Sequence, residues 1–259
     1  MIYQTHCALR LGDNLAALQL VRKLAQANPS GEFVHACNLA YYNQGETLKP
    51  VIEDLPNIRL IDIGQVSSDS VDLWKGAGGY FYAHPNRNDY VALMLDFYAL
   101  CCVRLGLPCP ITKREDMLFD YPALKAYGAF YGNFDWLVIN SQPHSGQFAG
   151  FNYKEFQSII GALCGKYSVV TTGPVGWPFG QVSAEHLTPT QIGNLSLHCK
   201  YILMVSTGVS WPTFNVWAAE SVKLRIILLD NERVELTPNT IHRNSIAGAH
   251  ELLKESGML

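Results

Sequence analysis

The chain has 259 residues, of which 48% are hydrophobic and 16% charged, and its formal net charge is −3. This composition is that of a soluble globular protein, and without a Lys/Arg cluster it gives no electrostatic reason to expect a nucleic-acid or membrane-surface partner. No run approaches the roughly 18 apolar residues of a membrane helix and no leader peptide is visible, so we expect a cytoplasmic protein without a transmembrane segment.

Strand and helix patterns alternate along the first half of the chain. Strands are predicted at residues 5–9, 32–37 and 58–63, and helices at residues 14–26, 45–53, 90–105 and, as a short connector, 121–131. The first helix is expected to be amphipathic, with a polar face made of Gln19, Arg22, Lys23 and Gln26. The long apolar helix is terminated by Gly106.

The alternation restarts near residue 134. Strands are predicted at residues 136–140, 167–172, 201–205 and 224–229, and helices at 154–164, 190–199, 212–221 and 246–255. Strands rich in Val, Ile and Leu that alternate with helices indicate parallel sheets covered by helices on both faces. The restart therefore predicts two α/β domains, residues 1–130 and 131–259.

Open parallel sheets bind ligands beyond the carboxyl ends of their strands, and four loops at such positions contain suitable residues. In the first, residues 10–14, Gly12 permits a close backbone approach or a positive φ. Asp13 either caps the following helix or points toward a ligand as a general base. The residues alone leave both interpretations open.

Two further loops belong to the second half. Residues 141–146 are polar and contain His144, which is either an ordinary surface histidine or a ligand contact. Residues 172–178 hold two Gly and two Pro, which predicts a stiff turn with a packing or a contact role.

The fourth loop, residues 206–210 (STGVS), leads into a predicted helix with Pro212 in its first turn. A helix start has unsatisfied N–H groups and a partial positive charge, and small residues before it leave those donors accessible to a phosphate or diphosphate. Simple capping of the helix by Ser210 is the alternative.

Two other features remain ambiguous. The aromatic and Gly-rich segment 74–84 predicts either ordinary loop packing or a surface that stacks on a sugar. Asp96, within an apolar helix, is either paired in the core or an alternative acid. The seven cysteines are irregularly spaced, mostly in apolar runs and without a CxxC pair, which is typical of reduced core thiols and predicts no metal site.

Two segments together resemble a known family. Residues 11–18, LGDNLAAL, resemble the LGD-x-L-x-A-L start of the heptosyltransferase-like enzymes of glycosyltransferase family 9. Residues 187–231, which include VSTGVSWPTFNVWAAE, resemble that family's V-G-x-D-(S/T)-G-x-x-H-x-A region, and the Thr-Gly-x-Ser-Trp form is closer to its autotransporter heptosyltransferase branch. The order of elements agrees along nearly the whole chain.

The resemblance implies a GT-B-like fold, that is, two Rossmann-like domains with parallel sheets facing a central cleft. The N-terminal domain would hold the acceptor and the C-terminal domain a nucleotide-diphospho-sugar. Asp13 matches the proposed catalytic base, and Thr207, Gly208 and Val209 match the loop whose backbone amides contact the diphosphate. With the strand-end loops, the candidate donor-binding set is Gly12, Asn14, Ser141, Thr172, Gly173, Ser206, Thr207, Gly208, Val209 and Ser210.

The resemblance implies an inverting, metal-independent hexosyl- or heptosyltransferase. It would use a sugar nucleotide as co-substrate, no cofactor, and an acceptor glycan, lipid-linked sugar or protein. Ser206 and Trp211 stand where the family has Asp and His, which leaves open a different donor or a lost activity. A sugar-nucleotide epimerase of the same architecture and a non-catalytic nucleotide-sugar-binding module are the alternatives.

Overall fold

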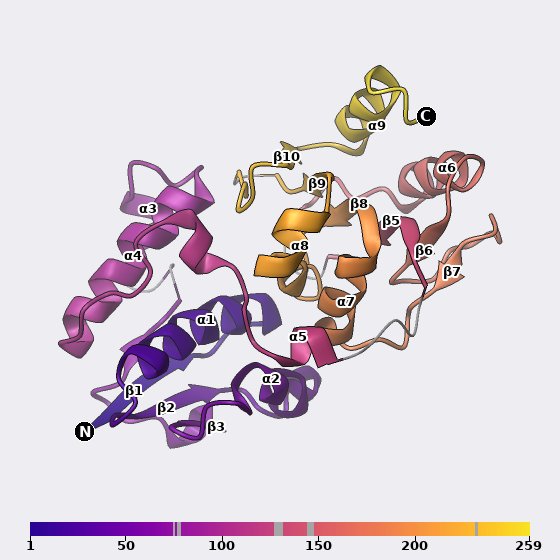
Figure 1. Ribbon diagram of the computed structural model, residues 1–259. Coiled ribbons are helices and arrows are strands. Elements are labelled where there is room, and N and C mark those ends of the chain that lie inside the picture. The colour runs from indigo at the N-terminus through magenta and orange to yellow at the C-terminus, as the bar shows by residue number, and fades with distance from the viewer. Residues whose placement is uncertain (75, 77–78, 127–131, 144–147, 231–232) are drawn as a thin grey trace. The chain divides into compact units, whose positions relative to one another are not determined.

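The chain forms two compact units, Met1–Ala123 and Leu124–Leu259, which we call unit 1 and unit 2. The computed structural model describes residues 1–74, 76, 79–126, 132–143, 148–230 and 233–259. Each unit contains one parallel sheet with helices (Figure 1), so the predicted α/β class with two parallel sheets is confirmed. The sequence placed the boundary after residue 130; the observed division falls within α5 (Ala123–Ala126).

Unit 1 is built on a four-stranded sheet with the order β3-β2-β1-β4. Its strands are β1 (Ile2–Cys7), β2 (Glu32–Cys37), β3 (Ile58–Asp62) and β4 (Val71–Asp72). Its helices and helical turns are α1 (Leu11–Ala27), η1 (Tyr41–Asn43), α2 (Gln44–Ile52), η2 (Ile63–Gln65), α3 (Tyr80–Ala83), α4 (Tyr90–Leu105) and η4 (Arg114–Met117). In Figure 1, α1 crosses the sheet formed by β1, β2 and β3.

The expected polar face of the first helix is partly buried, which corrects the prediction. Gln19 and Arg22 in α1 are 1% and 0% exposed. The Gln19 amide donates to the Leu118 carbonyl at 2.6 Å, and the Arg22 guanidinium donates to the Asp54 carboxylate. Burial is tolerated because the Gln19 amide nitrogen and an amino group of Arg22 each donate to an acceptor inside the protein.

Unit 2 contains a six-stranded sheet with the order β10-β9-β8-β5-β6-β7, in which every neighbouring pair is parallel. Its strands are β5 (Phe134–Ile139), β6 (Val169–Thr171), β7 (Val182–Ser183), β8 (Cys199–Val205), β9 (Leu224–Leu228) and β10 (Thr240–Arg243). Its helices and turns are α6 (Tyr153–Cys164), α7 (Pro189–Leu195), η5 (Ser196–His198), η6 (Trp211–Thr213), α8 (Val216–Ser221) and α9 (Ile246–Glu255).

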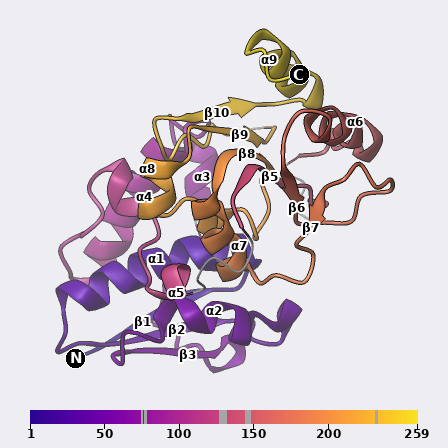
Figure 2. The same cartoon turned by 45° about the vertical axis from the view of Figure 1, so that its right-hand side comes forward.

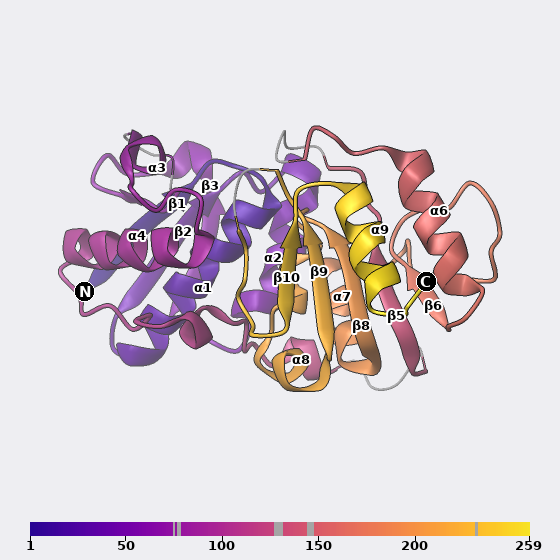
Figure 3. The same ribbon diagram turned by 90° about the horizontal axis from the view of Figure 1, so that it is seen from above.

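The strand order of unit 2 reverses at β5. From β5 the chain builds β6 and then β7 on one side, after which it returns to place β8, β9 and β10 on the other side. Figure 3 shows these strands side by side with α9 in front of them. The loops that follow β5 and β8 therefore leave neighbouring strands at a switch point, which is where open α/β sheets bind ligands.

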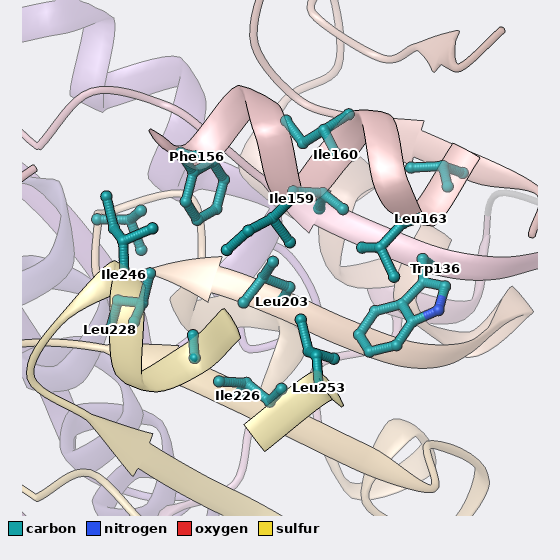
Figure 4. Close-up of a cluster of buried hydrophobic side chains, with 14 of the residues drawn as sticks. Trp136, Phe156, Ile159, Ile160, Leu163, Leu203, Ile226, Leu228, Ile246 and Leu253 are labelled. Carbon is teal, nitrogen blue, oxygen red and sulfur yellow. The ribbon is translucent and has the colours of Figure 1, made fainter. Parts of the chain in front are cut away.

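The core of unit 2 lies between the sheet and the pair α6 and α9 (Figure 4). Phe156, Ile159 and Ile160 of α6 contribute side chains that are at most 1% exposed, and Leu253 contributes from α9. These residues recur at helical spacing, which is why α6 was predicted with the observed C-terminal residue. Figure 2 shows α7 on the other face of the sheet.

Candidate functional site

The loop after β8, residues 206–210, lies at the switch point of unit 2 and is held by its own hydrogen bonds. The Ser210 hydroxyl accepts from the Thr207 N–H at 3.2 Å and donates to the Thr207 carbonyl at 2.8 Å. The Ser206 N–H donates to the Leu228 carbonyl at the end of β9. Ser206 and Ser210 are each 1% exposed, and their contact with a donor stays a prediction.

The helix predicted at residues 212–221 is broken, which is a correction. Trp211–Thr213 forms a single 3-10 turn, Phe214 leaves helical geometry with φ −83° and ψ 63°, and α8 begins only at Val216. The Asn215 side chain caps α8 by accepting from the Ala218 N–H at 2.8 Å. The start of α8 is therefore capped by a buried side chain, and the 206–210 loop is followed by a helical turn rather than by a helix.

Three donor groups of the 206–210 loop nevertheless make no hydrogen bond to the part of the chain that the structure describes. Among the described residues, the backbone N–H groups of Gly208 and Val209 donate to no acceptor. The Thr207 Oγ1 atom is buried and also lacks a partner in the described part of the chain. Two successive main-chain donors beside an unpaired hydroxyl suit an anionic ligand with several oxygen atoms.

A buried arginine of β9 is hydrogen-bonded to the two helical segments that follow this loop. Arg225 of β9 is fully buried and donates to the Ala218 carbonyl at 2.6 Å and to the Thr213 carbonyl at 3.4 Å. Its other amino group donates to Thr237 and Asn239. Burial lowers the pKa of the Arg225 guanidinium to about 10, so the group remains protonated at neutral pH and ties η6 and α8 to the sheet.

The loops after β5 and β6 are joined at the same edge of the sheet. The hydroxyls of Ser141 and Thr172 lie 3.4 Å apart. The Asn140 side chain accepts from the Gly173 N–H at 2.7 Å and donates to the carbonyls of Gly173 and Pro174. Asn140 was not predicted; an amide immediately after a buried strand is the sequence signal that identifies such a clamp.

Three of the four loops predicted to contact a ligand thus lie at the carboxyl ends of neighbouring strands. Ser141 follows β5, Thr172 and Gly173 follow β6, and the 206–210 loop follows β8, with β5 between β6 and β8. Ser141 is half-buried, and Thr172 is 7% exposed. His144 and Gly146 lie outside the described residues.

In unit 1, the predicted loop 10–14 is mostly helix. α1 begins at Leu11, three residues before the predicted start, so Gly12 and Asp13 occupy its first turn. The N-cap position is Arg10, whose side chain makes no capping hydrogen bond, and Asp13 is the third residue of the helix. The half-buried Asp13 carboxylate lies where a negative charge favours a helix start.

Asn14 is buried and hydrogen-bonded inside unit 1, and its assignment to donor binding stays a prediction. The side chain is 0% exposed. Its amide donates to the Leu9 carbonyl at 2.9 Å and to Gln44 at 3.0 Å, and its oxygen lies 3.3 Å from Nε2 of His35. The second ring nitrogen of His35 lies 2.9 Å from the Thr5 hydroxyl, so this network joins β1, α1 and β2.

His35 makes the stability of the protein depend on pH. Desolvation by burial, with a smaller effect from His6, lowers the pKa of His35 to about 3. The unfolded chain takes up a proton at this residue below about pH 6.5 while the folded chain does not, so stability is fully present above that pH and falls toward pH 3. We expect the His35→Leu variant to lose part of this slope in urea unfolding measured from pH 7 to pH 4. The exposed His186 is the control, because His186→Gln should retain the wild-type slope.

The remaining candidates of unit 1 are Asp96 and the segment 74–84, most of which the structure describes. The Asp96 carboxylate, 62% exposed, pairs with His84 Nε2 at 3.0 Å, so it is not buried in the core. In the segment 74–84, Tyr80 packs against Phe97 with ring centroids 5.4 Å apart, whereas Tyr82 is 70% exposed. Residues 75, 77 and 78 lie outside the described part of the chain.

The seven cysteines are free thiols, and burial raises the pKa of six of them, Cys7, Cys37, Cys101, Cys102, Cys164 and Cys199. No three His, Cys, Asp or Glu side chains of the described ranges are grouped in a way that could hold a metal ion. Within those ranges, no helix has the length and apolar character needed to cross a membrane.

Comparison with known proteins reveals similarity in structure only. No protein-family model and no curated protein sequence matches the chain. E. coli heptosyltransferase WaaC, solved with ADP-2-deoxy-2-fluoro heptose, is similar over 99% of this chain and 100% of its own, with a TM-score of 0.61 and 13% identity. E. coli ADP-heptose LPS heptosyltransferase II is similar over 98% of both chains, with a TM-score of 0.59 and 12% identity.

A third similar structure is longer than this chain and is described as containing iron. The iron-containing dodecameric heptosyltransferase TibC, solved in complex with ADP-D-beta-D-heptose, matches 93% of this chain and 62% of its own, with a TM-score of 0.53 and 13% identity. At these identities the comparisons establish the fold, which is that of the GT-B-like heptosyltransferases of glycosyltransferase family 9.

Proposed function

We propose that this chain, which has the heptosyltransferase fold, is a glycosyltransferase that binds a nucleotide-diphospho-sugar at the carboxyl edge of the unit 2 sheet. The 206–210 loop supports the proposal most directly, because the Gly208 and Val209 N–H groups and the Thr207 hydroxyl have no partner among the described residues and lie at the strand switch point. Among the similar structures, WaaC was solved with ADP and TibC with an ADP-heptose.

The loop suits the chemistry of a diphosphate leaving group. When the bond from the anomeric carbon to the diphosphate breaks, negative charge grows on the diphosphate oxygens. Fixed N–H donors stabilise that charge without reorganising, which lowers the barrier to transfer. The proposed reaction meets this charge with main-chain donors and requires no metal ion.

Asp13 is the proposed base on the acceptor side. Its carboxylate takes the proton of an acceptor hydroxyl, whose oxygen bonds to the anomeric carbon as the diphosphate departs with the electron pair. A single displacement of this kind inverts the configuration of that carbon. The proposed acceptor is the hydroxyl of a glycan, a lipid-linked sugar or a protein.

A nucleotide screen followed by turnover tests the function. A nucleoside diphosphate that binds only the folded state at 100 times its Kd adds about 2.7 kcal/mol of stability, so the melting temperature should rise with one of ADP, UDP, GDP or dTDP. The matching sugar nucleotide should then release nucleoside diphosphate, at a rate unchanged by EDTA. Release of an altered sugar would indicate an epimerase, and binding without turnover a binding module. If none of these nucleotides binds, the proposal is wrong.

Thr207 offers a sharper test of the donor site. Thr207→Val removes a buried hydroxyl that bonds to none of the described residues, so the free energy of unfolding should stay constant or rise by up to about 1 kcal/mol. Loss of its hydrogen bond to the ligand should weaken nucleotide affinity about tenfold, or about 1.4 kcal/mol. Calorimetric titration and urea unfolding measure the two effects.

Ser210→Ala is the contrasting variant. It removes the hydroxyl that bonds Thr207 twice within the loop, so it should cost about 1 kcal/mol of stability. Equal nucleotide affinity in Thr207→Val and the wild type would remove the Thr207 hydroxyl from the proposed site.

A further inference from the structure

An exposed aromatic residue, Tyr82, lies on the short helix α3 of unit 1. Tyr82 is 70% exposed, whereas Phe81 beside it is half-buried. The two rings meet edge to face, with centroids 5.3 Å apart and an angle of 81° between their planes. A large apolar ring in water gains free energy when a ligand covers it. Tyr82 is therefore a candidate contact for a ligand that has an apolar face.

The residues on both sides of this exposed ring are packed on α4. The ring of Tyr80 has its centroid 5.4 Å from that of Phe97 and 5.2 Å from that of His84. Nε2 of His84 lies 3.0 Å from the Asp96 carboxylate, and its Nδ1 accepts the Asn86 N–H at 3.2 Å. These contacts restrict the backbone of α3, which lowers the entropy that is lost when a ligand binds there.

Further contacts connect α4 to the helix that contains the proposed base. The hydroxyl of Tyr98, which follows Phe97 in α4, donates to the Ala16 carbonyl of α1 at 2.8 Å. Ala16 lies three residues after Asp13 in α1. Printed side by side in the fold, α3 contacts α4 and α4 contacts α1, so Tyr82 and Asp13 belong to one connected group of helices within unit 1.

The strands before α1 and α3 end at the same edge of the unit 1 sheet. α1 follows β1, and the segment that leads to α3 follows β4. β1 and β4 are parallel neighbours, and the strand order of unit 1 reverses between them. The carboxyl ends of such strands form a switch point, which is where open α/β sheets bind ligands.

The polar residues next to α3 suit a neutral sugar. A sugar ring has an apolar C–H face, which an aromatic ring can cover, and hydroxyl groups at its rim, which amide side chains bind as donors and acceptors. Asn86 and Asn88 are exposed residues just after α3. From residue 79 to residue 98 the charged side chains other than histidine are Arg87, Asp89 and Asp96. One cation against two carboxylates provides no attraction for an anionic lipid headgroup or a sugar acid.

We infer that Tyr82, Asn86 and Asn88 form a subsite for a neutral hexose unit of the acceptor. The inference rests on the proposed transferase function and narrows its acceptor to a sugar chain, either a free glycan or the sugar part of a lipid-linked acceptor. The Tyr82 ring covers the C–H face of the hexose, and the two amides bind its hydroxyl groups. The subsite holds the acceptor at a unit other than the one whose hydroxyl reacts at Asp13.

Ligand-observed NMR titration tests the subsite without turnover. The probes are maltotetraose, chitotetraose and mannotetraose, with tetragalacturonate as an anionic sugar. At least one neutral probe should bind the wild type, and Tyr82→Ala should weaken that binding about tenfold. Tyr82→Phe keeps the ring and should retain the affinity. Tetragalacturonate should bind more weakly than the neutral probe.

Val103→Ala is the matched control, because Val103 is 76% exposed on α4 and belongs to its last turn. Its affinity for the probe should equal that of the wild type, and the melting temperature reports on the folding of every variant. Three results would each overturn the subsite: binding of no neutral probe, tighter binding of tetragalacturonate, or equal affinity in Tyr82→Ala and the wild type. Loss in Tyr82→Ala of binding to vesicles of phosphatidylcholine and phosphatidylglycerol would assign the ring to a lipid surface instead.

Nucleotide binding separates the subsite from the proposed function. Affinity for ADP, UDP, GDP or dTDP should be the same in Tyr82→Ala as in the wild type, since the proposed nucleotide contacts belong to unit 2. Nucleotide binding without Tyr82-dependent sugar binding removes the subsite alone. Sugar binding through Tyr82 in a protein that binds none of these nucleotides contradicts the transferase function and leaves a sugar-binding site.

The octyl glycoside of the probe that binds distinguishes the two sources of the sugar chain. Equal affinity for the free sugar and its octyl glycoside supports the subsite with a free glycan as acceptor. Tighter binding of the octyl glycoside, still weakened by Tyr82→Ala, supports it with a lipid-linked sugar.

Discussion

Asp13→Asn is expected to slow sugar transfer by about 10²- to 10⁴-fold, because the amide has nearly the shape of the carboxylate but does not accept the acceptor's proton. Asp13 lies in the first turn of α1, in unit 1, whereas the proposed nucleotide contacts belong to unit 2. Nucleotide affinity should therefore change by less than about twofold, so that kcat falls while binding persists. Steady-state kinetics with calorimetric titration of the nucleoside diphosphate measures both.

Glu53→Gln is the matched control for this change. It makes the same replacement of a carboxylate by an amide at an exposed position just beyond α2 of the same unit. Its kcat and melting temperature should equal those of the wild type. A kcat in Asp13→Asn within a factor of two of the wild type would remove the carboxylate from the reaction.

Gly193→Ala is expected to cost about 2–3 kcal/mol of stability and to weaken nucleotide binding as well. A Cβ atom at Gly193 in α7 would lie 2.7 Å from Cβ and 2.8 Å from the carbonyl oxygen of Pro212, and 2.5 Å from a Leu124 methyl. The Leu124 side chain can rotate, but the Pro212 backbone cannot yield without moving η6. That turn directly follows the 206–210 loop, so the positions of the Gly208 and Val209 donors should shift with it.

Gly165→Ala isolates the effect of contact from the effect of losing a glycine. Gly165 follows α6 with φ −68° and ψ −17°, and an added Cβ would come no nearer than 3.4 Å to any atom. This variant should be unchanged or stabilised by up to about 1 kcal/mol. Urea unfolding of both variants, with equal stabilities as the contrary outcome, decides whether packing of α7 on η6 holds the loop.

The fold was largely predictable because long strands and helices have a recognisable spacing of apolar residues in the sequence. The buried run of β8 and the one-sided apolar spacing of α6 were identified within one residue at their C-terminal ends. The strands β4 and β7 were missed, since two residues each are too few to show a period. Thr240–Arg243, which follows a proline and alternates weakly, was also not recognised as a strand.

The candidate site was less predictable, because local sequence does not reveal tertiary partners. The helix expected after the 206–210 loop breaks at Phe214, where Asn215 forms a new cap and the buried Arg225 holds both helical pieces. The motif that contains Asp13 also contains Asn14. Only the fold shows that the Asn14 side chain is hydrogen-bonded to His35 and Gln44. A pattern therefore indicated the loop and not the use of each side chain in it.

The proposed use of peptide groups as donors in the 206–210 loop affects how the candidate site can change over time. Nearly any residue at positions 208 and 209 supplies an N–H group, so under this proposal substitution of the side chains there would leave anion binding in place as long as the turn keeps its shape. Selection would then act on the path of the chain and on the packing that holds it, such as the close contact at Gly193. It would act less on which side chains stand at positions 208 and 209. This explains in physical terms how an architecture shared with WaaC persists at 13% identity.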